Sequence, residues 1–192
     1  MGSLITHTYI VGQTQSGKSV VAKRLADRVQ RSGRGVIVHD PTSPTQGYGV
    51  AGWGKQAYVL NSFEAFAKVF WLSRGCLCII DEAGDVYKGE HDTEARRMLT
   101  RGRHLDPSTG GGLHTVVIIA QRQALINKSA RLQCSALFTF SATLSDAKSL
   151  SEDWQVNGFT DPKSPLFLPK LPHLHYVTMQ RGGVPRVGVL RF

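Results

Sequence analysis

The chain has 192 residues, of which 41% are hydrophobic and 19% are charged. These values exclude a disordered or fibrous protein and fit a single globular domain with its own core, because two domains of ordinary size need a longer chain. Lys and Arg outnumber Asp and Glu by 23 to 14, a net charge of +9, and this excess favours a polyanionic partner such as nucleic acid.

Apolar runs typical of strands alternate with helical periodicities along the chain, which is the signature of a mostly parallel sheet with helices on its faces. The first strand is expected at residues 7–11 and is followed by a glycine-rich loop. Val21, Leu25 and Val29 then recur at four-residue steps and predict a helix that ends near Gly33. Further strands are expected at residues 36–38, 57–60, 76–80, 114–120 and 136–140.

The segment after the second strand, residues 40–54, is rich in Pro and Gly and is expected to form a long loop that is either functional or mobile. Asn61, with Glu64 three positions later, predicts the N-terminal cap of a helix that Gly75 ends. Three phenylalanines lie on one face of that helix and are expected in the core. Two further helices are expected at residues 92–103 and 145–154.

The sequence pattern changes in the last part of the chain. Four prolines from residue 162 to residue 172 break up a linker, and two alternating stretches flank Gly182 and Gly183 as a predicted hairpin. We therefore expect a main α/β domain over residues 1–160. A proline-rich linker and a C-terminal hairpin, residues 161–192, are expected to pack on the same domain.

The cysteines and the hydrophobic runs indicate the kind of cellular compartment in which the protein is expected. Three cysteines are present, an odd number, and Cys76 and Cys78 alternate inside an apolar run. They are interpreted as buried thiols in a reducing compartment, because no further Cys or His follows at the spacing of a metal site. No run approaches the roughly 18 apolar residues of a membrane span, and the N-terminus lacks a signal-peptide pattern. The chain is therefore expected to be intracellular unless it is carried out as part of a particle.

The sequence GQTQSGKS lies directly behind the first strand and has the spacing G-x-x-x-x-G-K-S. Glycines at these positions let backbone N–H groups point inward at phosphates, and the helix that follows adds its N-terminal dipole. Lys18 is expected to reach the β- and γ-phosphates and Ser19 to ligate Mg²⁺. The pattern predicts a nucleoside triphosphate site with these nucleotide-binding residues: Gly12, Gln13, Thr14, Gln15, Ser16, Gly17, Lys18 and Ser19.

A second motif, CLCIIDEAG, is a buried strand that runs straight into Asp81 and Glu82. Such a strand places Asp81 at the carboxyl edge of the sheet beside the phosphate loop, where it can hold Mg²⁺ through a water. Glu82 can then polarise the attacking water as a general base. A third run, TVVIIAQR, ends at Gln121, whose amide can contact the γ-phosphate and report its loss.

The same residues also allow a GTPase interpretation, since Asp81 to Gly84 fits D-x-x-G and Asn127 to Ala130 resembles N-K-x-D. Guanine selectivity needs a carboxylate at the last position of the second motif, where this chain has Ala130. Asn127 also falls in a stretch expected to be helical, not at a strand end. The GTPase interpretation is therefore weaker than that of an ATPase.

The order of the motifs resembles that of the FtsK–HerA superfamily of P-loop ATPases, over about residues 5–150. The motifs are, in order, GQTQSGKS, IIDEA, a basic RGRH and VVIIAQR. The resemblance implies an ASCE, RecA-like α/β fold, a P-loop NTPase with a central, mostly parallel sheet flanked by helices. It also implies an arginine finger upstream of the Gln121 strand, for which Arg103 is the best match and Arg101 the reserve. The catalytic residues would then be Glu82, Gln121 and Arg103, with Ser19 and Asp81 at the metal.

A bare motor of this length is most similar to the genome-packaging ATPases of icosahedral viruses with an internal membrane. That resemblance implies ATP and Mg²⁺ as cofactors and a ring of identical subunits, a hexamer or pentamer, that translocates double-stranded DNA of any sequence into a capsid. A capsid vertex protein is a further expected partner, and the expected locations are the host cytoplasm and the virion. The alternative is a non-motor P-loop enzyme or switch, either a nucleotide kinase or a GTPase. Hydrolysis stimulated by duplex DNA would favour the motor.

Overall fold

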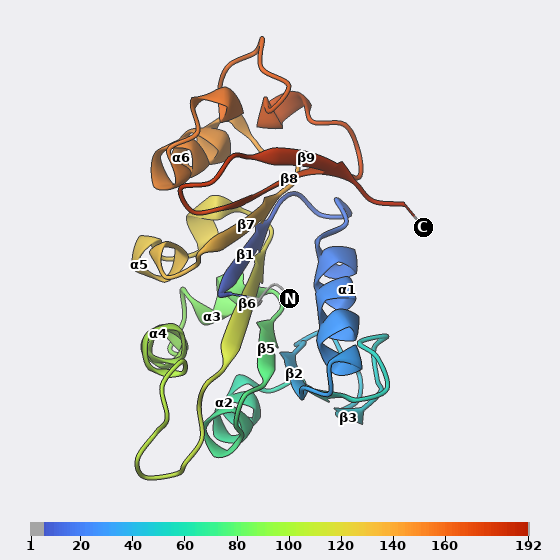
Figure 1. The fold of residues 1–192 in the computed structure, drawn as a ribbon, viewed down its shortest axis with the longest axis vertical. Helices are drawn as coiled ribbons and strands as arrows, with labels where there is room; N and C mark the ends of the chain where they lie inside the picture. The colour runs from blue at the N-terminus through green and yellow to red at the C-terminus, as the bar shows by residue number, and fades with distance from the viewer. Residues whose placement is uncertain (1–5, 192) are drawn as a thin grey trace.

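Nine strands make up one sheet in the computed structural model, which describes residues 6–191 (Figure 1). They are β1 (Thr8–Val11), β2 (Val36–His39), β3 (Gly47–Tyr48), β4 (Ala57–Leu60), β5 (Leu77–Ile80), β6 (Thr115–Ala120), β7 (Ala136–Thr139), β8 (His175–Gln180) and β9 (Arg186–Val189). The helices are α1 (Lys18–Arg31), α2 (Phe63–Leu72), α3 (Ala83–Val86), α4 (Asp92–Arg101), α5 (Lys128–Leu132) and α6 (Leu144–Trp154). Within residues 6–191, none of these helices is long and apolar enough to cross a membrane.

The strands lie in the order β3-β4-β2-β5-β6-β1-β7-β8-β9. From β4 to β7 they run parallel, while β3 at one end and the β8–β9 hairpin at the other are antiparallel additions. Parallel strands end at the same edge of a sheet, so the segments that follow Val11, Ile80 and Ala120 meet there. The mostly parallel sheet and the C-terminal hairpin expected from the sequence are confirmed.

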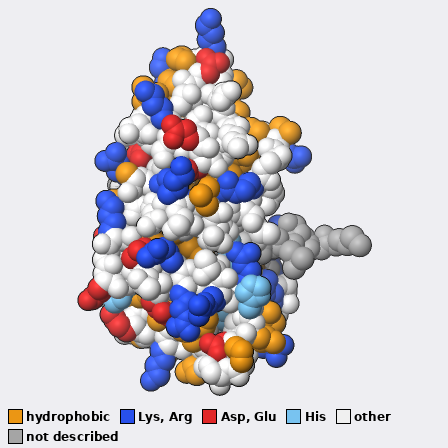
Figure 2. Space-filling model, turned by 90° about the vertical axis from the view of Figure 1, so that its left-hand side faces the viewer, with side chains coloured by type: hydrophobic (Ala, Val, Ile, Leu, Met, Phe, Trp, Pro, Cys, Tyr) orange, Lys and Arg blue, Asp and Glu red, His pale blue; other side chains and the backbone are white. Residues whose placement is uncertain are grey.

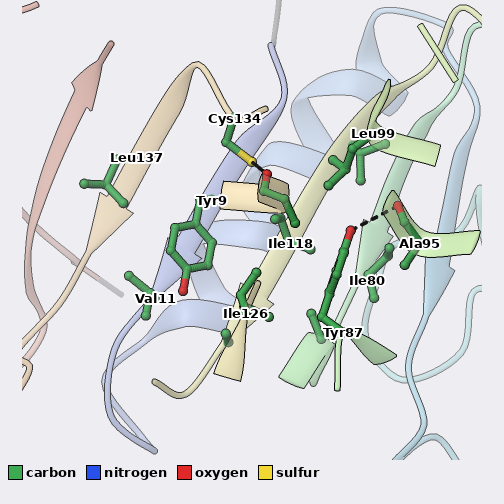
Figure 3. Close-up of a cluster of buried hydrophobic side chains, with 14 of the residues drawn as sticks. Tyr9, Val11, Ile80, Tyr87, Ala95, Leu99, Ile118, Ile126, Cys134 and Leu137 are labelled. Carbon is green, nitrogen blue, oxygen red and sulfur yellow. Dashed lines mark hydrogen bonds between the residues drawn. The ribbon is translucent and has the colours of Figure 1, made fainter. Parts of the chain in front are cut away.

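Two cores form because successive side chains of a strand point to opposite faces of the sheet. Ile10 packs on the face that α1 covers. Tyr9 and Val11 point to the other face, which α2 to α6 cover and which also holds the free, buried cysteines. Figure 3 shows this second core, with Tyr9 among Val11, Ile118 and Ile126. Each fully buried large apolar side chain stabilises the fold by about 1.5–3 kcal/mol.

The cap of α2 is Ser62, so the prediction of Asn61 as the cap was wrong. Ser62 Oγ accepts a hydrogen bond from the backbone N–H of Ala65 at 3.3 Å. Asn61 Nδ2 instead donates to the carbonyl oxygen of Ser43 at 3.2 Å. Asn61 and Ser62 are both residue types that cap helices. Ser62 is the cap in the structure, because the Asn61 side chain donates to the neighbouring loop instead.

Other helix boundaries also differ from the expectation. The helix expected to end at Gly75 ends earlier, at Leu72, and Gly75 takes φ +69° in the turn toward β5. α4 ends at Arg101, two residues before its predicted end. The stretch around Asn127 is a 3₁₀ turn (Gln123–Leu125) followed by α5, and the short α3 was not expected at all. Short helices carry too few periods for a pattern to be visible in the sequence.

The long loop expected at residues 40–54 is present, apart from the two-residue strand β3, and it packs against α1. Trp53 is buried and donates from Nε1 to Asp40 Oδ2 at 2.9 Å. Lys23 of α1 donates to the carbonyl oxygen of Ala51 at 2.8 Å, and its Nζ lies 5.2 Å from the centroid of the Trp53 ring. These contacts hold the loop against α1.

The C-terminal hairpin extends the sheet beyond β7. Arg181, at its turn, donates hydrogen bonds to the carbonyl oxygens of Cys134 and Asp153. Its guanidinium carbon also lies 4.3 Å from the centroid of the Trp154 ring. Arg181 therefore joins the hairpin both to the start of β7 and to the end of α6.

Candidate nucleotide-binding and hydrolysis site

The phosphate loop, residues 12–17, connects β1 to α1 at the carboxyl edge of the sheet. Its two glycines are required by their neighbours. A Cβ on Gly12 would lie 2.6 Å from Cβ of Phe140, and one on Gly17 would overlap the side chain of Leu190. Gly17 also has φ +105°, a backbone conformation that favours glycine. The loop is therefore packed tightly from outside and can present its concave side to a ligand.

Lys18, the first residue of α1, is buried and donates from Nζ to the carbonyl oxygen of Gln13, 2.8 Å away. Burial lowers the pKa of Lys18, and the negative charges of Glu82 and Asp81 oppose that shift. Ser16 Oγ is buried in the loop and has no hydrogen-bond partner in the described part of the chain. A phosphate would give both Lys18 and Ser16 an acceptor, so the loop fits the anion that its sequence predicts.

Glu82 and Gln121 follow the ends of β5 and β6 and meet beside the phosphate loop. Gln121 Nε2 donates to both carboxylate oxygens of Glu82, at 3.2 and 3.0 Å. Thr14 Oγ1 donates to Gln121 Oε1 at 3.3 Å, so a continuous chain of hydrogen bonds links the loop to Glu82. Glu82 has φ +47°, a strained conformation for a residue other than glycine, and such strain concentrates at functional sites.

Asp81 lies at the same edge in an environment that disfavours its charge. Its pKa is raised to about 6, chiefly by burial and then by the negative charges of Asp40 and Glu82. The backbone N–H of Glu82, which donates to Asp81 Oδ1 at 3.0 Å, and the ammonium of Lys18 act in the opposite direction. Asp81 and the hydroxyl of Ser19 in the first turn of α1 are hard oxygen ligands that suit Mg²⁺, and a bound cation would favour the charged carboxylate.

Replacing Asp81 by Asn is expected to raise the melting temperature of the nucleotide-free, metal-free protein at pH 8, and to raise it less at pH 5. An acid whose pKa is higher in the folded state than its unfolded value of about 3.9 destabilises the fold progressively as pH rises from the unfolded pKa to the folded pKa of about 6, and the loss is complete above that. Asn removes that effect and keeps the acceptor for the N–H of Glu82. The expected rise at pH 8 is about 2–4 °C, which corresponds to about 1 kcal/mol in a chain of this size.

Thermal unfolding by circular dichroism at both pH values measures this difference. Asp161→Asn is the matched control, because Asp161 is exposed and lies outside the site. An equal change in melting temperature at pH 5 and pH 8 for Asp81→Asn would contradict the prediction.

Asp40 is a site residue that the sequence analysis missed. It is buried directly after β2, and its charge contributes to the raised pKa of Asp81. Hydrogen bonds from Trp53 and from the backbone N–H and hydroxyl of Thr42 lower the pKa of Asp40 and oppose the effect of its burial. The available signal was an apolar run that ends in an acidic residue, the same pattern that identified Asp81.

Arg103 lies away from the phosphate loop of its own chain. Its side chain is exposed and donates from Nη2 to Gln133 Oε1 at 3.1 Å. The carbonyl oxygen of Leu99, on the preceding turn, contacts both Arg103 and the ring of His7 at the start of β1. This position is near the amino edge of the sheet, opposite the phosphate loop. Arg101, the reserve candidate, lines a groove between α4 and α5.

The structure gives Asn127 a structural role. Asn127 is the N-terminal cap of α5, and its Oδ1 accepts a hydrogen bond from the backbone N–H of Ser129 at 2.9 Å. A base-reading asparagine in a GTPase follows a strand, whereas the strand here ends seven residues earlier, at Ala120. The weak resemblance to N-K-x-D therefore has a local explanation.

Solved structures with a similar fold include the genome packaging NTPase B204 from Sulfolobus turreted icosahedral virus 2 in complex with AMPPCP. It is 16% identical in sequence, and the match covers 97% of this chain and 98% of that chain with a TM-score of 0.72. The fold is that of a P-loop NTPase. B204, the DNA-packaging ATPase from Sulfolobus turreted icosahedral virus, is also 16% identical, with coverages of 95% and 96% and a TM-score of 0.64.

A third structure comes from a different biological system. The pCW3 conjugation coupling protein TcpA, in its monomer form with ATPγS, is 14% identical, with 95% of this chain and 59% of that chain covered and a TM-score of 0.65. No protein-family model and no curated protein matches the sequence. These comparisons confirm the expected P-loop NTPase fold, and identities this low show the fold alone.

Proposed function

We propose that the chain is an ATPase that moves double-stranded DNA through a ring of identical subunits, a hexamer or pentamer, and into a viral capsid. The observation that carries the proposal is the convergence of Lys18, Asp81, Glu82 and Gln121, which provides a phosphate ligand, a metal ligand and a base at one sheet edge. The near full-length match to a genome packaging NTPase supports the packaging role. Such a motor would act in the host cytoplasm on a capsid vertex protein and would be associated with the virion.

In the proposed hydrolysis, Lys18 and the N–H groups of the loop hold the β- and γ-phosphates. Ser19 and Asp81 would hold Mg²⁺, which would supply neutralising charge at the phosphates. Water attacks the γ-phosphorus as the bond to the β–γ bridging oxygen breaks, and Glu82 accepts the proton of that water. Gln121 holds Glu82 for this transfer through its two hydrogen bonds.

Arginines along α4 provide a surface for the DNA backbone. Arg96, Arg97 and Arg101 line a groove of about 480 Å³ between α4 and α5, with Thr and Ser hydroxyls beside them. Arg96 and Arg97 form ion pairs on their own helix, whereas Arg101 has no ion-pair partner among residues 6–191. Figure 2 looks onto the side of the molecule that carries α4, α5 and α6, and Lys and Arg side chains are spread along it. Guanidinium groups suit phosphate oxygens in this setting.

Duplex DNA is expected to bind independently of its sequence and to dissociate steeply as salt rises, because contacts with backbone phosphates release counterions. Arg101→Gln should reduce the slope of log K against log salt concentration by about 1, the effect of one lost phosphate contact. Fluorescence anisotropy with two unrelated duplexes between about 50 and 200 mM salt measures this slope. Arg31→Gln is the control, because Arg31 is an exposed arginine of α1, on the opposite face of the sheet.

The same duplexes should increase the rate of ATP hydrolysis. Neither a nucleotide kinase nor a GTPase switch is expected to respond in this way. Binding that is insensitive to salt, or that strongly selects one sequence, would count against a packaging motor.

A further inference from the structure

The C-terminal part of the chain returns to the phosphate loop. Leu190, just after β9, is buried against Gly17, and its backbone N–H donates to the carbonyl oxygen of Leu174 at 3.0 Å. Leu174 Cδ2 would lie 3.5 Å from a Cβ on Gly17. Arg24 of α1 donates to the carbonyl oxygen of Arg191. The turn before β8 and the end of β9 are thus fastened together on the loop and on the start of α1.

A pocket of about 390 Å³ lies at this junction. One wall consists of phosphate-loop and α1 residues that include Lys18, Ser19 and Val20, and the other consists of His173 and Leu174. Lys18 and Ser19 belong to the predicted phosphate site, so the pocket is continuous with it. Its volume falls within the range of about 300–1,000 Å³ that is usual for small-molecule sites.

A second hollow lies on the other side of the phosphate loop and suits a nucleoside less well. It measures about 200 Å³ and is lined by Gln13, Thr14 and Gln121 together with Arg122 and Asp146. Arg122 and Asp146 form an ion pair there, with Nε 3.2 Å from Oδ2. This volume is below the range that is usual for small-molecule sites.

The backbone at Leu174 is strained. Leu174 has φ +61°, a left-handed conformation that is unfavourable for a residue with a Cβ and that persists at ligand clamps when the surroundings hold it. Here the hydrogen bond from Leu190 and the packing on Gly17 hold it. The result is that the Leu174 side chain and the exposed imidazole of His173 line the pocket together.

We propose that His173 and Leu174 form the base and ribose subsite of the nucleotide. This inference rests on the proposed function, because it assumes that a nucleoside triphosphate has its phosphates on the loop. The imidazole of His173 provides an aromatic face on which a purine can stack, and Leu174 provides an apolar contact for the ribose and the base edge. The C-terminal hairpin is then part of the nucleotide site as well as an extension of the sheet.

The test compares a triphosphate ligand that carries a nucleoside, a non-hydrolysable ATP analogue, with one that lacks it, inorganic tripolyphosphate. His173→Ala should weaken the ATP analogue by about 5- to 150-fold, the usual effect of a lost aromatic stacking partner, and leave tripolyphosphate affinity unchanged. Leu174→Gly should do the same, and glycine keeps the left-handed backbone at this position without strain. His104→Ala is the control, since His104 is exposed and lines a different pocket, formed with Trp71 and Asp106.

Isothermal titration calorimetry of the full chain gives both affinities. Unchanged affinity for the ATP analogue in both variants would overturn the subsite, and so would an equal loss of tripolyphosphate affinity, which would mean general damage to the loop. In the first case the phosphate loop would still be the nucleotide site. If the unmodified chain bound neither ligand, the proposed function would fail as well, so the two failures are distinguishable.

Discussion

Replacing Glu82 by Gln is expected to lower the rate of ATP hydrolysis by about 10²–10⁴-fold, the usual effect of losing a general base, while nucleotide affinity stays the same. Glutamine has the size of glutamate and retains one oxygen that can accept a hydrogen bond from Gln121 Nε2. It cannot take a proton from water. Single-turnover hydrolysis measures the loss, and equilibrium binding of a non-hydrolysable analogue measures the affinity.

Two further variants bracket this result. Lys18→Ala should abolish nucleotide binding, because Lys18 is the buried cation of the phosphate loop. Glu152→Gln should change neither quantity, since Glu152 is exposed on α6, far along the chain from the site. If Glu82→Gln lost binding to the same extent as Lys18→Ala, Glu82 would be a binding residue and its assignment as the base would be wrong.

The positions of the candidate site residues at the sheet edge could be predicted from sequence because each residue is marked locally. Asp81, Glu82 and Gln121 each follow a continuous apolar run, and the ends of parallel strands share one edge. The lateral order of the strands could not be predicted in the same way. No local pattern shows that β6 lies between β1 and β5, yet this insertion brings Gln121 into contact with both Thr14 and Glu82.

The role of Gln121 illustrates the same limit. The sequence predicts an amide that contacts the γ-phosphate, and that role stays a prediction. The structure adds a positioning role, because both carboxylate oxygens of Glu82 accept from the Gln121 amide. The sequence analysis did not identify His173 and Leu174 as candidate site residues. They reach the loop only because β8 pairs with β7, a contact between segments about 40 residues apart that leaves no mark in either segment.

Arg103→Ala is expected to lower the rate of ATP hydrolysis by about 10³–10⁵-fold if its guanidinium acts on the γ-phosphate of a neighbouring subunit. The position of Arg103 excludes it from the site of its own chain, because it lies near the amino edge of the sheet beside His7. It is exposed, and within the described part of the chain Gln133 is its one side-chain acceptor. A finger in trans needs this combination of exposure and light attachment. A solvated arginine at the end of a helix would instead contribute less than about 1 kcal/mol to stability.

Mixing two inactive variants separates these roles. Arg103→Ala and Lys18→Ala subunits should each be inactive alone and active together, because some interfaces then pair an intact Lys18 site with an intact Arg103. Gln133→Ala removes the partner of Arg103 but leaves the guanidinium, so a finger predicts retained activity, whereas a purely structural contact predicts the same defect in both variants. An Arg103→Ala protein that assembles and hydrolyses ATP at the normal rate would refute the assignment. Arg101, which has no ion-pair partner among residues 6–191, is then the arginine to replace.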